Sequence, residues 1–185
     1  FIGCVMGNTY ATTRENWKNY GDITLKESKT SRTFLAGVAG CTQSITLNKA
    51  ANYGEIEATA SIGREVNIGG VIALSKGALS NSENHGVLNI DHSVFERSST
   101  YVEYKEYAVG GVIGSSTNKV LDCTNTSTGV INVAGHIFNG NPSIGYNGIG
   151  GIVGVSKSII KRSTNEANIT VAVTTSKVAS DTTEN

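Results

Sequence analysis

The sequence predicts an all-β protein, a parallel β-helix (β-solenoid) of about five coils with a period of 33 to 41 residues. Three observations predict this fold. The 185 residues include 22 glycines, one proline and many Ser, Thr and Asn, a composition that favours strands and turns over helices. Two short motifs each occur five times with a shared period. In the second motif, apolar residues alternate with a period of two, as in a strand with one buried face.

The first motif is an apolar stretch built around glycines. Its copies are FIGCVMG (1–7), LAGVAG (35–40), IGGVIA (68–73), VGGVIG (109–114) and IGGIVG (149–154). Their last residues lie 33, 33, 41 and 40 residues apart. We expect one strand through each Gly-Gly-Val stretch. The glycines then permit tight turns and close packing of coils.

The second motif begins with an asparagine and continues as Asn-x-Gly-x-Ile in its clearest copies. The leading residues, spaced by 33, 32, 41 and 40, are Asn19, Asn52, Asn84, Asn125 and Asn165. Apolar pairs two residues apart follow each of them: Ile23 and Leu25, Ile56 and Ala58, Leu88 and Ile90, Ile131 and Val133, Ile169 and Val171. The pattern predicts a turn at the asparagine and a short strand after it.

One repeat is therefore expected to contain a strand, a return segment, the asparagine turn, a second strand and an excursion of variable length. Such a unit cannot bury a core alone, whereas stacked units pair equivalent strands and enclose a continuous core. A sandwich of hairpins is the main structural alternative, but hairpins do not by themselves predict a common period. We expect a single domain over residues 1–173, with repeats starting near 1, 35, 68, 109 and 149, and a linker or further coil over 174–185.

The repeat resembles the GLUG-type glycine-rich repeats of bacterial secreted and surface proteins. The resemblance lies in its order of features: Gly-Gly-h-h-Gly (h, apolar), then about ten residues ending in a small residue, then Asn-x-Gly-x-Ile. Cys4, Ala73 and Ala167 depart from the pattern where glycine is expected. The resemblance implies an extracellular, solenoid-like module of a larger adhesive or cell-wall protein. It implies no catalytic residues.

The five asparagines suggest an internal ladder in which each side-chain amide bonds to its neighbours in the coils above and below. The alternative is that each asparagine caps its own turn. Cys123 stands where other repeats have Ala or Ser, which indicates a small core residue. A disulfide between Cys4 and Cys41, which lie in adjacent coils, is left open.

Binding residues are expected where the period lengthens, because repeat proteins commonly carry binding loops there. The third and fourth repeats carry extra residues, and both excursions follow the same strand in adjacent coils, so they should emerge side by side. Their aromatic residues are Tyr101, Tyr104, Tyr107, Phe138 and Tyr146. Exposed rings can stack on sugars or anchor a protein. The alternative is that some of these rings cover the open side of the solenoid.

The sequence leaves three kinds of function open. The leading one is a non-enzymatic stalk or adhesin at the cell surface or outside the cell. The second is a β-helix enzyme acting on polysaccharides through Asp22, Glu55 or Glu57, since Asp22 and Glu55 occupy equivalent positions in adjacent coils. The third is a filament subunit that associates end to end, or an array that continues in further repeats.

Other ligands are not expected. The 15 basic and 15 acidic residues balance, which gives no footprint for nucleic acid. No apolar run approaches the roughly 20 residues that span a bilayer, so no membrane insertion is expected. Glycine-rich stretches followed by Ser, Thr and Asn, without a helical pattern, do not predict a dinucleotide loop. His85, His92 and His136 share no repeat position, and no cofactor or metal is predicted.

Overall fold

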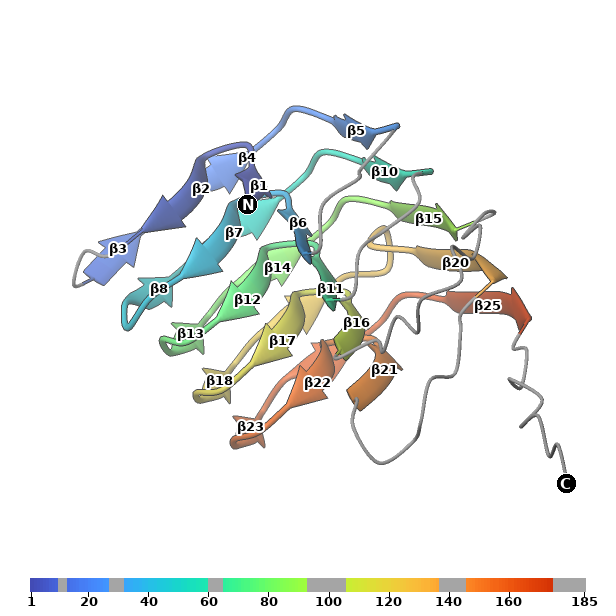
Figure 1. The fold of residues 1–185 in the computed structure, drawn as a ribbon. Coiled ribbons are helices and arrows are strands. Elements are labelled where there is room, and N and C mark those ends of the chain that lie inside the picture. The colour runs from blue at the N-terminus through green and yellow to red at the C-terminus, as the bar shows by residue number, and fades with distance from the viewer. Residues whose placement is uncertain (10–12, 27–31, 60–64, 93–105, 137–145, 175–185) are drawn as a thin grey trace, which may run out of the picture.

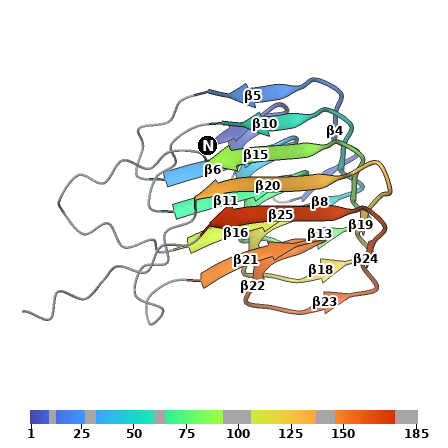
Figure 2. The same ribbon diagram turned by 90° about the vertical axis from the view of Figure 1, so that its right-hand side faces the viewer.

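The chain forms five stacked coils of β-structure, as the sequence predicts (Figure 1). The computed structural model describes residues 1–9, 13–26, 32–59, 65–92, 106–136 and 146–174. Each coil contributes five short strands, one to each of five parallel sheets. Seen from the side, the coils lie on one another like the turns of a spring (Figure 2). We number the coils 1 to 5 along the chain and the sheets I to V along each coil.

Each sheet is built from equivalent strands of successive coils. Sheet I contains β1 (Ile2–Gly3), β6 (Arg32–Ala36), β11 (Glu65–Gly69), β16 (Glu106–Gly110) and β21 (Tyr146–Gly150). Sheet II contains β2 (Met6–Thr9), β7 (Ala39–Thr42), β12 (Ile72–Ser75), β17 (Ile113–Ser116) and β22 (Val153–Ser156). Sheet III contains β3 (Thr13–Glu15), β8 (Thr46–Asn48), β13 (Leu79–Ser80), β18 (Val120–Leu121) and β23 (Ile160–Lys161).

Each strand of the fourth sheet ends at the repeated asparagine, and the fifth sheet follows it. Sheet IV contains β4 (Lys18–Asn19), β9 (Ala51–Asn52), β14 (Glu83–Asn84), β19 (Thr124–Asn125) and β24 (Thr164–Asn165). Sheet V contains β5 (Ile23–Leu25), β10 (Ile56–Ala58), β15 (Leu88–His92), β20 (Ile131–His136) and β25 (Ile169–Thr174). Every pairing between neighbouring coils is parallel and follows the repeat, so Ile2 pairs with Leu35 and Asn84 with Asn125.

The Gly-Gly-Val stretch is a corner, and the prediction of one strand through it was wrong. In coil 3, β11 ends at Gly69, Gly70 and Val71 form a bend, and β12 begins at Ile72. The same bend separates sheets I and II in the other four coils. A Cβ on Gly70 would overlap the carbonyl oxygen of Gly111 in the next coil and the side chain of Asn84. The glycine is therefore required by close approach, since none of these corner glycines has a positive φ.

The interior contains two apolar clusters. The first lies between sheets I and V and includes Leu35, Ile68, Leu88 and Ile131. The second is enclosed by sheets II, III and IV and consists of Val38, Leu47, Ala50, Val71, Ile72, Leu79, Val112, Ile113, Val120 and Cys123. The corner glycines between sheets I and II face the asparagines at the ends of the sheet IV strands, so these two features separate the clusters.

Small polar side chains satisfy the backbone inside the tight turns. Ser82 Oγ donates to Ser80 O (2.8 Å) and accepts a hydrogen bond from Ala50 N of the preceding coil (3.0 Å). Cys123 occupies the equivalent position, with Sγ 3.3 Å from Leu121 O, and burial raises the pKa of its thiol to about 11. Cys123 is thus a small core residue. All three cysteines, Cys4, Cys41 and Cys123, are free thiols, so the disulfide left open by the sequence is not formed.

One residue per coil adopts a left-handed conformation at the corner between sheets III and IV. Their φ angles lie between 50° and 61°, and the residues are Asn16, Lys49, Asn81, Asp122 and Arg162. In coils 4 and 5 this column carries an ion pair, with Arg162 Nε 2.6 Å from Asp122 Oδ1. Hydrogen bonding from Arg162 lowers the pKa of Asp122. Asparagine and aspartate tolerate this conformation better than other residues, which accounts for three of the five.

We expect the buried side chain of Asn67 to lower the stability of the folded chain. Its side chain is fully buried in β11, and neither its amide nitrogen nor its oxygen has a hydrogen-bond partner among the described residues. The equivalent positions in coils 2 and 4 are Phe34 and Ala108. We therefore expect Asn67→Val to raise the free energy of unfolding by about 1–2 kcal/mol, because it removes an unpaired buried amide. Urea unfolding followed by circular dichroism measures this, and a loss of stability would contradict the explanation.

Candidate functional site

The five repeated asparagines form a continuous ladder through the interior. Nδ2 of each of the first four asparagines donates to Oδ1 of the asparagine in the next coil, over distances of 2.8, 3.0, 2.9 and 2.8 Å from Asn19 to Asn165. The other N–H of each amide bonds to the carbonyl oxygen of its own turn, as from Asn84 to Gly86 (2.9 Å). The structure thus combines the two arrangements that the sequence left open. We call this set the asparagine ladder.

The residue after each of the first three ladder asparagines is aromatic and lies on the outer surface. The rings of Tyr20 and Tyr53 stack with centroids 4.8 Å apart, and those of Tyr53 and His85 with centroids 4.5 Å apart. These spacings are close to the distance of about 4.7–4.9 Å between paired strands. Both faces of Tyr53 are covered by its neighbours, whereas Tyr20, in coil 1, is 69% exposed. We call these three side chains the ring column.

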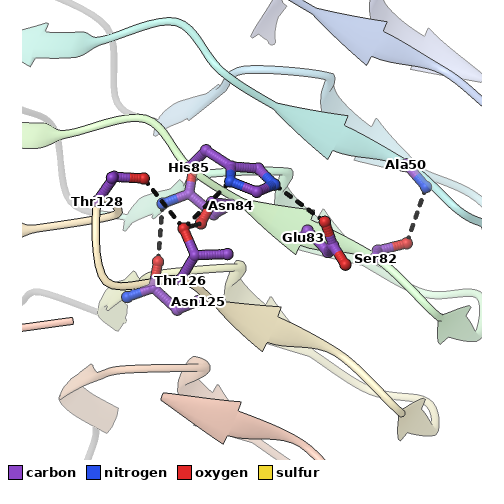
Figure 3. A network of polar contacts seen from close by, with 8 residues as sticks. All are labelled: Ala50, Ser82, Glu83, Asn84, His85, Asn125, Thr126 and Thr128. Atoms are coloured by element: carbon purple, nitrogen blue, oxygen red, sulfur yellow. Dashed lines mark hydrogen bonds and ion pairs between the residues drawn. The ribbon is translucent and has the colours of Figure 1, made fainter. Parts of the chain in front are cut away.

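A polar network surrounds the last ring of this column (Figure 3). Nε2 of His85 lies 2.9 Å from Glu83 Oε2, and Nδ1 lies 3.2 Å from Thr126 Oγ1 of coil 4. The Thr126 hydroxyl donates to Asn84 O (3.1 Å) and also contacts Thr128 Oγ1 (3.1 Å). His85 therefore lies between a carboxylate of its own coil and a hydroxyl of the next.

A hydroxyl, an imidazole and a carboxylate in this order are also the components of a nucleophilic triad. Here Thr126 Oγ1 lies 3.1 Å from the backbone oxygen of Asn84 and 3.2 Å from His85 Nδ1, so the backbone oxygen competes with the imidazole for the hydroxyl proton. One face of the His85 ring is covered by Tyr53. The network joins coil 3 to coil 4, and this is the role that its contacts support.

The carboxylates considered for polysaccharide chemistry lie on the outer surface beside the ring column. Asp22 and Glu55 are neighbours in adjacent coils, since Asp22 Oδ1 accepts a hydrogen bond from Glu55 N (2.7 Å). Glu55 Oε1 accepts one from Asn89 of coil 3. Glu57 is exposed in β10. The two residues predicted to be close are thus in contact through the backbone N–H of Glu55, and each carboxylate accepts a hydrogen bond from the coil that follows it.

Of the five aromatic residues predicted to form a binding surface, the structure describes the side chain of Tyr107 only. Tyr107 is only 3% exposed and packs in the first core cluster. It is therefore not part of an exposed aromatic surface, and its ring covers the interior instead. Tyr101, Tyr104 and Phe138 lie outside the described residues, as does the side chain of Tyr146.

The described strand ends do show where the two long excursions leave the solenoid. β15 and β20 are paired neighbours that precede them, and β16 and β21 are paired neighbours that follow them. Both excursions therefore run from the C-terminal end of a sheet V strand to the N-terminal end of the sheet I strand in the next coil. The shorter connections over 27–31 and 60–64 join the same two sheets.

Sequence reasoning missed the ring column and the network around His85. A signal was present, because aromatic residues follow three successive ladder asparagines at equivalent repeat positions. Within the described segments, no three His, Cys, Asp or Glu side chains gather closely enough to hold a metal ion. Nor do these segments contain a helix with the length and apolar character that a membrane span requires. Comparison of the chain with protein-family models, curated proteins and solved structures found no match.

Proposed function

We propose that the chain is a structural module of a cell-surface or secreted protein, a stalk or adhesin segment that holds binding loops on one edge. The proposal rests on one observation, that polar side chains of the chain form hydrogen bonds between neighbouring coils. The asparagine ladder, the Ser82 and Cys123 positions and the network around His85 all join one coil to the next. Such an arrangement supports rigidity along the axis.

The loops provide the binding function in this proposal. The two long excursions begin at paired strands of coils 3 and 4, and they end at paired strands of coils 4 and 5. A rigid scaffold that presents two adjacent loops is a common arrangement for recognition. The ligand class we propose is a glycan or a cell-surface protein, bound through the aromatic residues of these loops.

A loop exchange tests this function. We expect the protein to bind one or more sugars on a glycan array, and replacement of residues 93–105 by the five residues of the 60–64 connection to abolish that binding. The exchange should leave the thermal unfolding temperature nearly unchanged, because the shorter connection joins the same sheets in coil 2 to coil 3. A second variant with 137–145 replaced in the same way is the matched control for the contribution of each loop.

The enzymatic alternative is tested in the same samples. It is favoured only by the proximity of Asp22 and Glu55. Release of reducing ends from a polysaccharide by the native protein, abolished by Glu55→Gln, would overturn the structural function. Binding that survives both loop exchanges would instead move the binding surface away from the loops.

A further inference from the structure

The charged side chains are divided between two sides of the stack, although the chain has 15 basic and 15 acidic residues in all. One side consists of sheet III and the turns before and after it, and its described segments are 13–17, 43–50, 76–82, 117–123 and 157–163. Among these described segments, seven side chains are basic and two are acidic: Arg14, Lys49, Lys76, Lys119, Lys157, Lys161 and Arg162 against Glu15 and Asp122. We call this side the basic edge.

The side formed by sheet V has the opposite charge. Its segments run from each ladder asparagine to the last described residue of the coil, and in them five side chains are acidic and one is basic: Asp22, Glu55, Glu57, Asp91 and Glu166 against Lys26. Sheets III and V lie on opposite sides of the stack (Figure 1). A large anion is therefore attracted to the basic edge and repelled from sheet V.

Each of the three inner coils places one exposed lysine on the basic edge: Lys49 in coil 2, Lys76 in coil 3 and Lys119 in coil 4. Neighbouring coils cover both faces of these coils, so the lysines are exposed on the outer surface of the stack. Within the part of the chain that the structure describes, no carboxylate forms an ion pair with any of the three. Their ammonium groups are thus available to an external anion.

The acidic charge beside these lysines is already offset. Asp122 is the one acidic residue of the basic edge in the described segments of coils 2 to 4. Arg162 of coil 5 donates two hydrogen bonds to its carboxylate, from Nε (2.6 Å) and from Nη2 (2.8 Å). The three lysines therefore dominate the electrostatic potential at the inner coils.

The lysines follow one another along the axis at the spacing of the coils, about 4.7–4.9 Å for paired strands. They cross the basic edge obliquely, because Lys76 precedes β13, Lys119 directly precedes β18 and Lys49 follows β8. A lysine carries its charge on a flexible stem with rotatable donors, so the three ammonium groups can meet one extended chain. One sugar unit of a linear polysaccharide has a length similar to the coil spacing. A polymer with one carboxylate per sugar therefore matches this edge.

The neutral side chains of the basic edge favour a polysaccharide over nucleic acid. Thr46, Asn48 and Ser80, on β8 and β13, present partly exposed hydroxyl and amide groups, which can form hydrogen bonds with sugar hydroxyls. The inner segments 43–50, 76–82 and 117–123 contain no aromatic residue. Proteins that bind single-stranded nucleic acid stack its bases on aromatic rings, and these segments provide none.

We propose that the basic edge binds a linear polyuronate, an acidic polysaccharide with one carboxylate per sugar, laid along the axis so that its carboxylates meet the lysines of successive coils. The proposal is independent of the function proposed for the long excursions, because they connect sheet V to sheet I, whereas this surface is formed by sheet III. The equal numbers of acidic and basic residues conceal this surface in the sequence, since the two charges lie on different sides of the folded stack.

Isothermal titration calorimetry with polygalacturonate at several sodium chloride concentrations tests the proposal. The unaltered chain should bind at low salt, and the logarithm of its affinity should fall linearly with the logarithm of the salt concentration, as for other polyanions. Combined replacement of Lys49, Lys76 and Lys119 by glutamine should weaken binding by about tenfold and reduce that slope, because each exposed ion pair contributes modestly. The matched control replaces the same three residues by arginine, which keeps the charges, and should bind like the unaltered chain. Circular dichroism should show that both variants are folded.

Other results contradict the proposal. Absence of binding at low salt, undiminished binding by the glutamine variant, or equal binding of neutral dextran would each show that the basic edge does not recognise a polyuronate. Tighter binding of a single-stranded DNA oligonucleotide, lost in the glutamine variant, would identify nucleic acid as the partner instead. Chains with exchanged excursions should retain polygalacturonate binding, so this test succeeds or fails separately from that of the loops. Loss of binding in those chains alone would assign the polysaccharide to the excursions.

Discussion

Asn84→Ala is expected to lower the free energy of unfolding by about 3–5 kcal/mol, because Asn84 is the central residue of the asparagine ladder. It accepts a hydrogen bond from Asn52 and donates to Asn125 Oδ1 and Gly86 O, all at 2.9 to 3.0 Å. Its side chain is fully buried. Truncation therefore leaves two amides and one carbonyl without a partner where water does not reach.

Two variants show whether the lost hydrogen bonds cause this effect. Asn165→Ala removes the exposed end of the ladder and should cost about 0.5–1 kcal/mol, since water replaces the lost bonds. Asn84→Asp keeps the volume but cannot donate, so it should be at least as damaging as alanine at neutral pH. Urea unfolding followed by circular dichroism gives all three values. Equal losses for Asn84→Ala and Asn165→Ala would contradict a role for the ladder in stability.

Gly111→Ala is expected to destabilise the chain by about 3 kcal/mol, at the upper end of the cost of overpacking. A Cβ at this corner would lie 2.5 Å from Asn125 Cγ and would overlap the carbonyl oxygen of Gly151 in the next coil. The backbone atoms cannot move away without disturbing the pairing of sheets I and II. The change therefore strains the corner and the ladder together.

Gly21→Ala is the matched control for this substitution. Its nearest atom would be Asn19 Oδ1 at 3.7 Å, an ordinary contact, because Gly21 lies in coil 1. The same change of residue should alter stability there by less than about 0.5 kcal/mol. Thermal unfolding of both variants separates the effect of close approach from the general effect of replacing glycine. Similar melting temperatures for the two variants would refute the steric explanation.

The sequence was sufficient for the repeat, the coil stacking and the positions of the ladder. These depend on side chains that recur at a fixed period, such as Asn52 and Asn84, and on the alternation that places Ile56 in the core. The sequence did not predict that each coil has five strands, three more than the two expected. A strand as short as Lys18–Asn19 is too short to show alternation, and it exists because its neighbours in the stack supply its partners.

The candidate site was predicted only in part. Tyr107 belongs to an alternation with Val109 that continues the strand backward from the corner, and this pattern places the ring inside. The stacking of Tyr20 on Tyr53 depends on in-register pairing of coils, which is a property of the assembled solenoid. The network of His85 with Thr126 joins residues 41 apart, across the repeat of altered length.

The direction of the bonds between coils has a mechanical consequence. The strands run around the axis, whereas the hydrogen bonds between coils run along it, as from Gly70 N to Gly110 O. Tension applied to the two ends of the chain therefore loads one coil at a time and peels it from the stack. Each coil of 33 to 41 residues releases roughly 110–140 Å of extended chain at about 3.4 Å per residue. Under such tension we expect the solenoid to lengthen in steps while its remaining coils stay intact.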